Sequence, residues 1–344
     1  MAKTTAPSTR IIRALDIGWG HAKLSRLDPV LGTLEYLSFP SLAPRHVEMG
    51  LQTGLSGKRD TKVVYVDGTA YEVGPDASDL DSGEATRNLN DQYILTEQYK
   101  AVFYGALAYM REPEPDLVVD LLVVGLPLSN MRAAAKLRDL MVGVHAIAPG
   151  QSVEVKDALV LPQPYGGYRY CESLAPQEPA FAALSDETVL VVDPGYLTFD
   201  YLLVHNGRVV ENRSGAHNGG VSKVLRAIAD SISSKHGITY GNLSAIDRGL
   251  KRRAMKVSGK IESLDEHIRS TRGVVEGAVS YMKNIVGDGS DIDTVILLGG
   301  GGPVYQKTLT AAYPSHAVHA VDDPGMANVR GFQLAGEARA KDVA

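Results

Sequence analysis

Two stretches of this sequence share one design and lie 177 residues apart. In the first, residues 14–23, an apolar run ends on Asp16 and is followed by two closely spaced glycines and a lysine. In the second, residues 191–200, an apolar run ends on Asp193 and is followed by a glycine and a threonine. A repeat of this kind limits the chain to folds in which one structural unit occurs twice. It predicts two similar α/β domains, each with its own copy of the motif.

The bulk properties agree with two globular domains. The length of 344 residues corresponds to roughly two domains, and 44% hydrophobic with 22% charged residues is an ordinary composition. The net charge of −5 argues against a general binder of the nucleic-acid backbone, so no direct nucleic-acid contact is expected. The single cysteine, Cys171, excludes an intrachain disulfide and favours a cytoplasmic location. The apolar runs are too short to span a membrane, and residues 1–10 are expected to form a flexible tail.

Turn signals and apolar patterning predict a three-stranded meander around each copy of the motif. The strands are expected at residues 11–17, 22–27 and 34–39 in the first copy, and at 188–192, 199–204 and 209–213 in the second. Elsewhere the pattern predicts a hairpin about Asp67-Gly68, a helix over 96–110, one strand over 153–161, a turn over 165–170 and helical pieces over 243–264.

The paired motifs favour a polyphosphate ligand. Glycine turns expose backbone N–H groups, which are good donors to phosphate oxygens. Asp16 and Asp193 would stand beside those phosphates, and carboxylates in that position require a divalent cation such as Mg²⁺ between them. Lys23 supplies a compact positive charge for a terminal phosphate and Thr198 a hydroxyl. The run Gly299 to Gly302 lacks Cβ atoms, so a nucleoside ring can lie flat against its backbone.

Taken together, these motifs resemble those of a known superfamily. They are Asp16-x-Gly18-x-Gly20-x-x-Lys23, Asp193-x-Gly195-x-x-Thr198-x-Asp200 and Leu298-Gly299-Gly300-Gly301. In that order they look like the phosphate 1, phosphate 2 and adenosine motifs of the actin, sugar-kinase and chaperone ATPases. The nearest resemblance is to bacterial plasmid-segregation actin-like proteins of the ParM/StbA type, and it runs from about Ile11 to Gly336.

The resemblance implies an actin-like fold of two ribonuclease H-like domains with a nucleotide cleft between them. Domain I would comprise residues 11–165 plus 324–344, and domain II residues 166–323. Asp16 and Asp193 would organise Mg²⁺, with Asp193 also in a catalytic role. The residues implied to hold phosphates are Gly18, Gly20, Lys23, Gly195 and Thr198, and those implied to hold the adenosine are Gly299, Gly300 and Gly301. GTP in place of ATP stays open, because such a loop contacts the ring mainly through backbone.

Gln163 stands where relatives carry the Gln or Glu that orients the attacking water. An amide positions water but is too weak a base to deprotonate it, so slow hydrolysis is implied. ATP-bound subunits would add head to tail into a filament, and a separate DNA-binding adaptor protein would connect that filament to a plasmid. Two rival functions stay open: a small-molecule kinase of the same superfamily, and a structural protein that binds nucleotide without turnover. The kinase requires a carboxylate base where this chain has Gln163.

Some features differ from the family pattern or allow two interpretations. His21-Ala22 replaces a pair that often carries hydroxyl or amide groups, so one phosphate hydrogen bond is either missing or made by His21. Trp19 either packs beneath the first loop or acts as a local wedge. The basic residues in 251–260 suggest a DNA or partner patch, but the acidic residues that follow favour a solvated helix face.

Overall fold

The computed structural model describes residues 10–47, 59–80, 93–112, 116–250 and 252–342. The chain divides into two compact units. Unit 1 contains Met1–Ser173 and Met326–Ala344, and unit 2 contains Leu174–Gly325. Residues 1–9 of the expected tail and Lys251 of the basic cluster lie outside the described residues.

Unit 1 is built on a five-stranded sheet with the order β10-β7-β1-β2-β3. The strands are β1 (Ile12–Ile17), β2 (His21–Leu27), β3 (Leu34–Pro40), β7 (Leu121–Leu126) and β10 (Ala158–Pro162). The first three form the predicted antiparallel meander, and β7 and β10 run parallel to β1. Every residue of β1 is buried, as expected for a strand that is covered on both faces.

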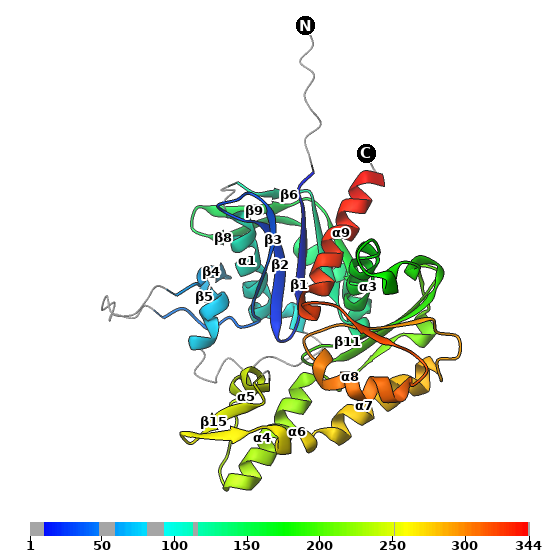
Figure 1. Ribbon diagram of the computed structural model, residues 1–344. Helices are drawn as coiled ribbons and strands as arrows, with labels where there is room; N and C mark the ends of the chain where they lie inside the picture. Colours follow the sequence, from blue (N-terminus) through cyan, green and yellow to red (C-terminus); the bar gives the residue numbers. More distant parts are fainter. Residues whose placement is uncertain (1–9, 48–58, 81–92, 113–115, 251, 343–344) are drawn as a thin grey trace. The chain divides into compact units, whose positions relative to one another are not determined.

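Helices cover this sheet. They are α1 (Glu97–Arg111), α2 (Ala134–Met141), α3 (Gln163–Ser173) and α9 (Ala327–Asp342). Helix α9 covers the face of β1 that carries Ile12 and Ala14, where Val329 and Phe332 complete a buried apolar cluster. Figure 1 shows α9, in red, beside β1 and α3. Thr96 caps α1 by accepting a hydrogen bond from the backbone N–H of Tyr99, at 3.2 Å.

Two smaller sheets complete unit 1. Strands β4 (Lys62–Val66) and β5 (Thr69–Val73) form the predicted hairpin. Its turn needs two residues with positive φ, and Asp67 and Gly68 adopt φ values of 47° and 85°. The second sheet has the order β6-β9-β8, with β6 (Val118–Val119), β8 (Gly143–Ala148) and β9 (Gln151–Val155). The single strand predicted over 153–161 is wrong, because the chain leaves β9 and enters β10 of the main sheet.

Unit 2 repeats the meander of unit 1, but the third strand predicted over 209–213 is wrong beyond Val209, because residues 211–213 form a 3-10 helix. Its sheet has the order β13-β12-β11-β17-β18, and β14 also pairs with β12. The strands are β11 (Thr188–Pro194), β12 (Phe199–His205), β13 (Arg208–Val209), β14 (Gly215–His217), β17 (Thr294–Leu297) and β18 (Val318–Ala320). The helices are α4 (Val221–His236), α5 (Leu243–Leu250), α6 (Asp265–Arg269), α7 (Arg272–Val286) and α8 (Gly302–Ala312). Apolar side chains from the sheet and these helices form one continuous core.

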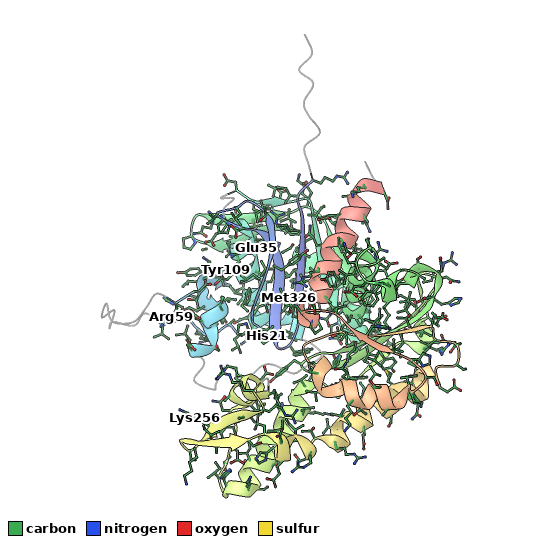
Figure 2. All side chains as sticks on the ribbon, in the orientation of Figure 1. His21, Glu35, Arg59, Tyr109, Lys256 and Met326 are labelled. Carbon is green, nitrogen blue, oxygen red and sulfur yellow. The ribbon has the colours of Figure 1, made fainter. Side chains whose placement is uncertain are left out.

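Two further predictions of local structure are wrong. The turn expected over 165–170 is the middle of helix α3, which carries residues 166–173 within unit 1 although the sequence placed them in the second domain. The helical pieces expected over 243–264 end with α5, and a hairpin follows, formed by β15 (Ala254–Val257) and β16 (Lys260–Ser263). Lys256 of the basic cluster therefore lies on a strand of this hairpin (Figure 2).

Short 3-10 helices connect several of these elements. They are η1 (Pro75–Asp79), η2 (Tyr93–Leu95), η3 (Leu128–Ala133), η4 (Pro179–Phe181), η5 (Leu184–Asp186), η6 (Glu211–Arg213) and η7 (Pro324–Met326). No helix in the described part of the chain is both long and apolar enough to cross a membrane.

Candidate functional site

The two glycine turns have the same hydrogen-bonded geometry. In unit 1 the N–H of Gly18 donates to the carbonyl of His21, at 3.1 Å, and β1 pairs with β2 so that Asp16 faces Lys23. In unit 2 the N–H of Gly195 donates to the carbonyl of Thr198, at 2.8 Å. Strands β11 and β12 place Asp193 opposite Asp200 in the corresponding register. Each pair of positions is related by the 177-residue shift, so the sequence repeat is also a repeat of local structure.

Carbonyl groups of both turns accept hydrogen bonds from residues outside the turns. In unit 1 the side-chain hydroxyl of Ser41 donates a hydrogen bond to the carbonyl of Gly18, at 2.6 Å. The backbone N–H of Ser41 donates to the carbonyl of Gly20, at 3.0 Å. In unit 2 the start of α4 takes this role, since the N–H groups of Gly220 and Val221 donate to the carbonyls of Leu197 and Gly195. Anchoring the carbonyls fixes the direction of the intervening N–H groups.

Three of these N–H groups are suited to bind an anion. The backbone N–H groups of Trp19, Gly20 and Leu197 have no acceptor among the residues that the structure describes. Backbone N–H groups near the interior are normally paired, so a turn that leaves them open has a donor for a ligand or water. The phosphate-binding role of the turns requires such donors and stays a prediction.

Asp16 contacts two other predicted site residues of unit 1. Its side chain is buried, and its Oδ1 accepts a hydrogen bond from Nε2 of Gln163 at 2.6 Å. Its Oδ2 lies 3.0 Å from Nζ of Lys23. The sequence separates Asp16 from Gln163 by most of the unit, and the parallel neighbours β1, β7 and β10 bring them together. Lys23 therefore neutralises Asp16 in this structure, whereas the sequence assigned its charge to a phosphate.

In unit 2 the corresponding position opposite the aspartate carries another acid. Asp193 and Asp200 are both buried, and the hydroxyl of Thr198 donates to Oδ2 of Asp200 at 2.5 Å. The hydroxyl of Thr198, which the sequence assigned to the phosphate site, thus donates to a neighbouring carboxylate in this structure. A carboxylate stands where unit 1 has Lys23, which makes this half of the repeat the more acidic one.

The predicted adenosine loop packs directly against Asp193. A Cβ placed on Gly299, whose φ is +70°, would lie 2.2 Å from Oδ1 of Asp193, so only glycine fits there. A Cβ on Gly301 would lie 2.7 Å from the carbonyl oxygen of Pro194, which already accepts the N–H of Gly301. A Cβ on Gly300 would meet nothing within 4 Å. Gly299 and Gly301 are therefore required for close packing, and Gly300 leaves the open surface that a flat ring requires.

The donors present suit a hydrated divalent ion. No group of three or more His, Cys, Asp or Glu side chains in the described part of the chain is arranged to hold a metal directly. Mg²⁺ binds carboxylate oxygens and usually keeps several of its waters. In unit 1 the buried carboxylate of Asp16, and in unit 2 those of Asp193 and Asp200, each fit that mode of contact, which needs few direct ligands. Both oxygens of Asp16 already have partners, which favours contact through water.

Aromatic packing explains Trp19. Its ring is buried and stacks on Tyr93, with centroids 4.6 Å apart, and Tyr93 meets Tyr99 edge to face at 5.1 Å. Burial, with smaller effects from Tyr93 and Asp16, raises the pKa of Tyr99 well above its usual value. Trp19 therefore packs beneath the first turn. His21 is exposed at the turn end of β2 (Figure 2), which leaves its ring accessible to solvent.

A cavity of about 310 Å³ lies elsewhere in unit 1. It is lined by Arg10, Ile12, Asp120, Leu121, Asp157, Arg339 and Ala340. These residues surround the amino-terminal ends of β1, β7 and β10, whereas Asp16 and Gln163 lie at the carboxyl ends. The cavity therefore takes no part in the candidate site.

The sequence missed the residues that support the turns. Ser41 holds the first turn, and Gly220 with Val221 holds the second. Their positions in the sequence could have indicated this supporting role, because each follows the third strand of its meander. Tyr93 offered none, since it lies far from Trp19 along the chain.

Two family models match the sequence. One, described as the N-terminal domain of actin-like proteins, matches residues 14–166. The other, described as the C-terminal domain of the archaeal MreB-like actin homologue, matches residues 191–311. Together they cover both copies of the motif. No curated protein matches the chain.

Solved structures share the fold over nearly the whole chain. The apo pSK41 ParM protein is 22% identical with a TM-score of 0.67, over 98% of this chain and 99% of that chain. A ParM subunit from a 15-stranded filament of Clostridium botulinum is 17% identical with a TM-score of 0.75, over 96% and 99%. An archaeal actin homologue in complex with ADP is 16% identical with a TM-score of 0.73, over 95% and 99%.

At these identities the solved structures establish the fold, and the family models establish membership. The predicted actin-like fold is confirmed, and the structural neighbours include both ParM proteins and archaeal actin homologues. With its repeated glycine turns and its two matched domains, the chain belongs to the actin-like protein superfamily.

Proposed function

We propose that this protein is an actin-like ATPase that assembles into filaments with ATP and Mg²⁺ and acts in plasmid segregation. The observation that carries the proposal is the hydrogen bond from Gln163 to Asp16 beside a glycine turn with open N–H groups. This bond orients the amide and occupies its N–H₂ end, so the Oε1 end is the part available to accept a hydrogen bond from water. That arrangement supports water attack on a bound phosphate.

The roles of the other site residues are proposed from the chemistry of the turns and the loop in which they lie. The turns at Gly18 to Gly20 and Gly195 to Thr198 hold phosphates, and the loop at Gly299 to Gly301 holds the nucleoside. Asp16 of unit 1 and Asp193 of unit 2 would contact Mg²⁺ through its waters, and the ion would supply positive charge to balance that of the phosphates. Since an amide cannot deprotonate water, turnover is slow. The filament is proposed from the similar proteins, whose names include a ParM filament, and the plasmid and adaptor are proposed from the family resemblance of the sequence motifs.

Sedimentation with and without ATP and Mg²⁺, with phosphate release followed in parallel, tests this function. We expect protein to pellet only with nucleotide, and phosphate to appear as the filaments age. Absence of ATP-dependent pelleting at tens of micromolar protein would contradict the filament. Pelleting with no phosphate release would favour a structural protein without turnover, and release only with a small hydroxyl compound would favour a kinase.

Two substitutions test the roles of the residues. Gln163→Ala should lower the rate of phosphate release by about 10²-fold, because it removes the group that orients water, and should leave nucleotide affinity nearly unchanged. Asp16→Asn should weaken Mg²⁺-dependent ATP binding, measured by competition with a fluorescent nucleotide. A parent-like rate in the first variant, or parent-like binding in the second, would show that the assigned role is wrong.

A further inference from the structure

Helices α3 and α9 touch through their backbones at two glycines. A Cβ placed on Gly331 would lie 1.7 Å from the carbonyl oxygen of Gly166. A Cβ on Gly166 would lie 2.5 Å from the carbonyl oxygen of Asn328. Real Cβ atoms do not approach other atoms so closely, so neither position accepts a side chain unless the helices move apart. Figure 1 shows the two helices side by side.

The ring of Phe332 continues this contact toward the candidate site. Phe332 is fully buried on α9, and a Cβ placed on Gly166 would lie 2.5 Å from its Cε1. On the other side of the ring is the end of β7, where a Cβ on Gly125 would lie 2.5 Å from Cε2 of Phe332. The same Cβ would lie 3.0 Å from Cγ of Gln163. Gln163 and Phe332 therefore share the space that a side chain at position 125 would fill.

Helix α3 depends on this packing to orient Gln163. Gln163 is its first residue, and Gly166 and Gly167 follow within the first turns. Glycine inside a helix costs about 0.5–1 kcal/mol relative to alanine, so the start of α3 has low intrinsic stability. The backbone contact with α9 is what compensates for it, and the amide of Gln163 is then aligned with Asp16.

We propose that Gly166, Gly331 and Phe332 are positioning residues for Gln163. They set the distance between α3 and α9, and through it the orientation of the Gln163 amide. This inference depends on the proposed function, in which that amide orients water. None of the three residues touches the nucleotide in that scheme. Their effect on phosphate release should therefore pass entirely through Gln163.

A double-mutant cycle tests this dependence. Gly331→Ala forces α3 away from α9 and should lower the rate of phosphate release about 10-fold or more, with less than about a threefold change in ATP affinity. In a Gln163→Ala background the same substitution should cause no further loss, because the group on which it acts is absent. Gly277→Ala is the matched control, since a Cβ there, on helix α7, meets nothing within 4 Å. Equal losses in the two backgrounds would overturn the proposal.

A spectroscopic measurement tests the positioning even if Gly331→Ala misfolds or the proposed function is wrong. Phe332→Leu is a milder change that keeps an apolar side chain in the same space. In protein with ¹⁵N-labelled glutamine, the Gln163 side-chain amide signal is identified by its loss in Gln163→Ala. It should shift in Phe332→Leu and stay in place in Gly277→Ala. If the parent releases no phosphate, the proposed function fails while this arm still tests the positioning. An unchanged signal in Phe332→Leu would contradict it.

Discussion

Several glycines of this protein are required because another group occupies the space of a side chain. Gly299 is the clearest case, since Oδ1 of Asp193 lies where its Cβ would be. The sequence indicated that a glycine run follows a strand here, which was enough to predict a loop that approaches a ligand. It could not distinguish Gly299, which is constrained by Asp193, from Gly300, which is open. That difference depends on β11 and β17 being neighbours in the sheet.

Alanine substitutions at these two glycines should therefore have unequal effects. Gly299→Ala should lower the free energy of unfolding by about 2 kcal/mol or more, because it combines a positive φ with a clash against Asp193. Gly300→Ala should change it by less than about 0.5 kcal/mol, as for a site away from packed contacts. Urea unfolding followed by circular dichroism measures both. Similar values for the two variants would show that the loop is not packed as described.

Cys171 is predicted to be inert. Its side chain is fully buried on α3, and this burial raises the pKa of the thiol to about 12. The thiolate is the reactive form, so little of it exists at neutral pH. The native protein should therefore not react with a thiol reagent such as dithiobisnitrobenzoate, and one equivalent should react in denaturant. Rapid labelling of native protein would indicate that α3 opens.

At the scale of whole elements, the sequence predicted best where local signals agree with the sheet. The first meander, the first two strands of the second and the Asp67-Gly68 hairpin are confirmed, because turn chemistry and alternation indicate the same structure. Helix α3 was missed because Gly166 and Gly167 oppose a helix locally. The contact with α9 decides its structure, and it joins residues more than a hundred positions apart.

The β15–β16 hairpin was missed for a similar reason. Its turn at Ser258-Gly259, with φ values of 49° and 80°, lies among charged residues that the sequence analysis assigned to a helix. Glu262 anchors β16 from two directions. Its Oε1 accepts a hydrogen bond from Lys235 of α4, at 2.8 Å, and lies 3.0 Å from Nε2 of His267 in α6. The basic cluster is therefore presented by a structured hairpin that is tied to the body of unit 2.

This anchor should make stability depend on pH. The hydrogen bonds from Lys235 and His267 lower the pKa of Glu262 from 4.5 to about 2. A lowered pKa in the folded state means that the stabilisation is complete above pH 4.5 and is lost as the pH falls toward 2. Glu262→Gln should therefore be less stable than the parent at pH 7, and the difference should shrink below pH 4.5. Urea unfolding over this pH range measures it, and a constant difference would contradict the anchor.

The whole molecule consists of two units that differ in how the chain supplies them. Unit 2 is one continuous segment with its own apolar core. Unit 1 is discontinuous, because its sheet is covered by α9 from the end of the chain. The sequence repeat predicted that there are two similar units, and the family resemblance implied that the last segment returns to the first. Patterning alone could not have shown that return, since α9 follows β18 in the second copy as α3 follows β10 in the first, yet it belongs to unit 1.

Fragments should reflect this difference. A fragment of residues 174–325 should fold alone, with a cooperative unfolding transition, because all of its core side chains lie within it. A chain that ends at residue 325 should leave unit 1 without Val329 and Phe332, which complete its cluster with Ile12 and Val123. Loss of large buried side chains costs several kcal/mol each, so unit 1 should become sensitive to protease. A protease-resistant unit 1 in the truncated chain would disprove this dependence.

The late arrival of α9 has a consequence for protein synthesis. Chains emerge from the ribosome amino terminus first, so residues 1–173 are made long before the helix that completes their unit. Unit 2 is complete before α9 has left the ribosome. The orientation of Gln163 then waits for the last segment of the chain, because Phe332 and Gly331 belong to it. Under the proposed function, nascent chains and chains that lack α9 would thus have no oriented Gln163 amide, and nucleotide turnover would begin only after α9 has packed on unit 1.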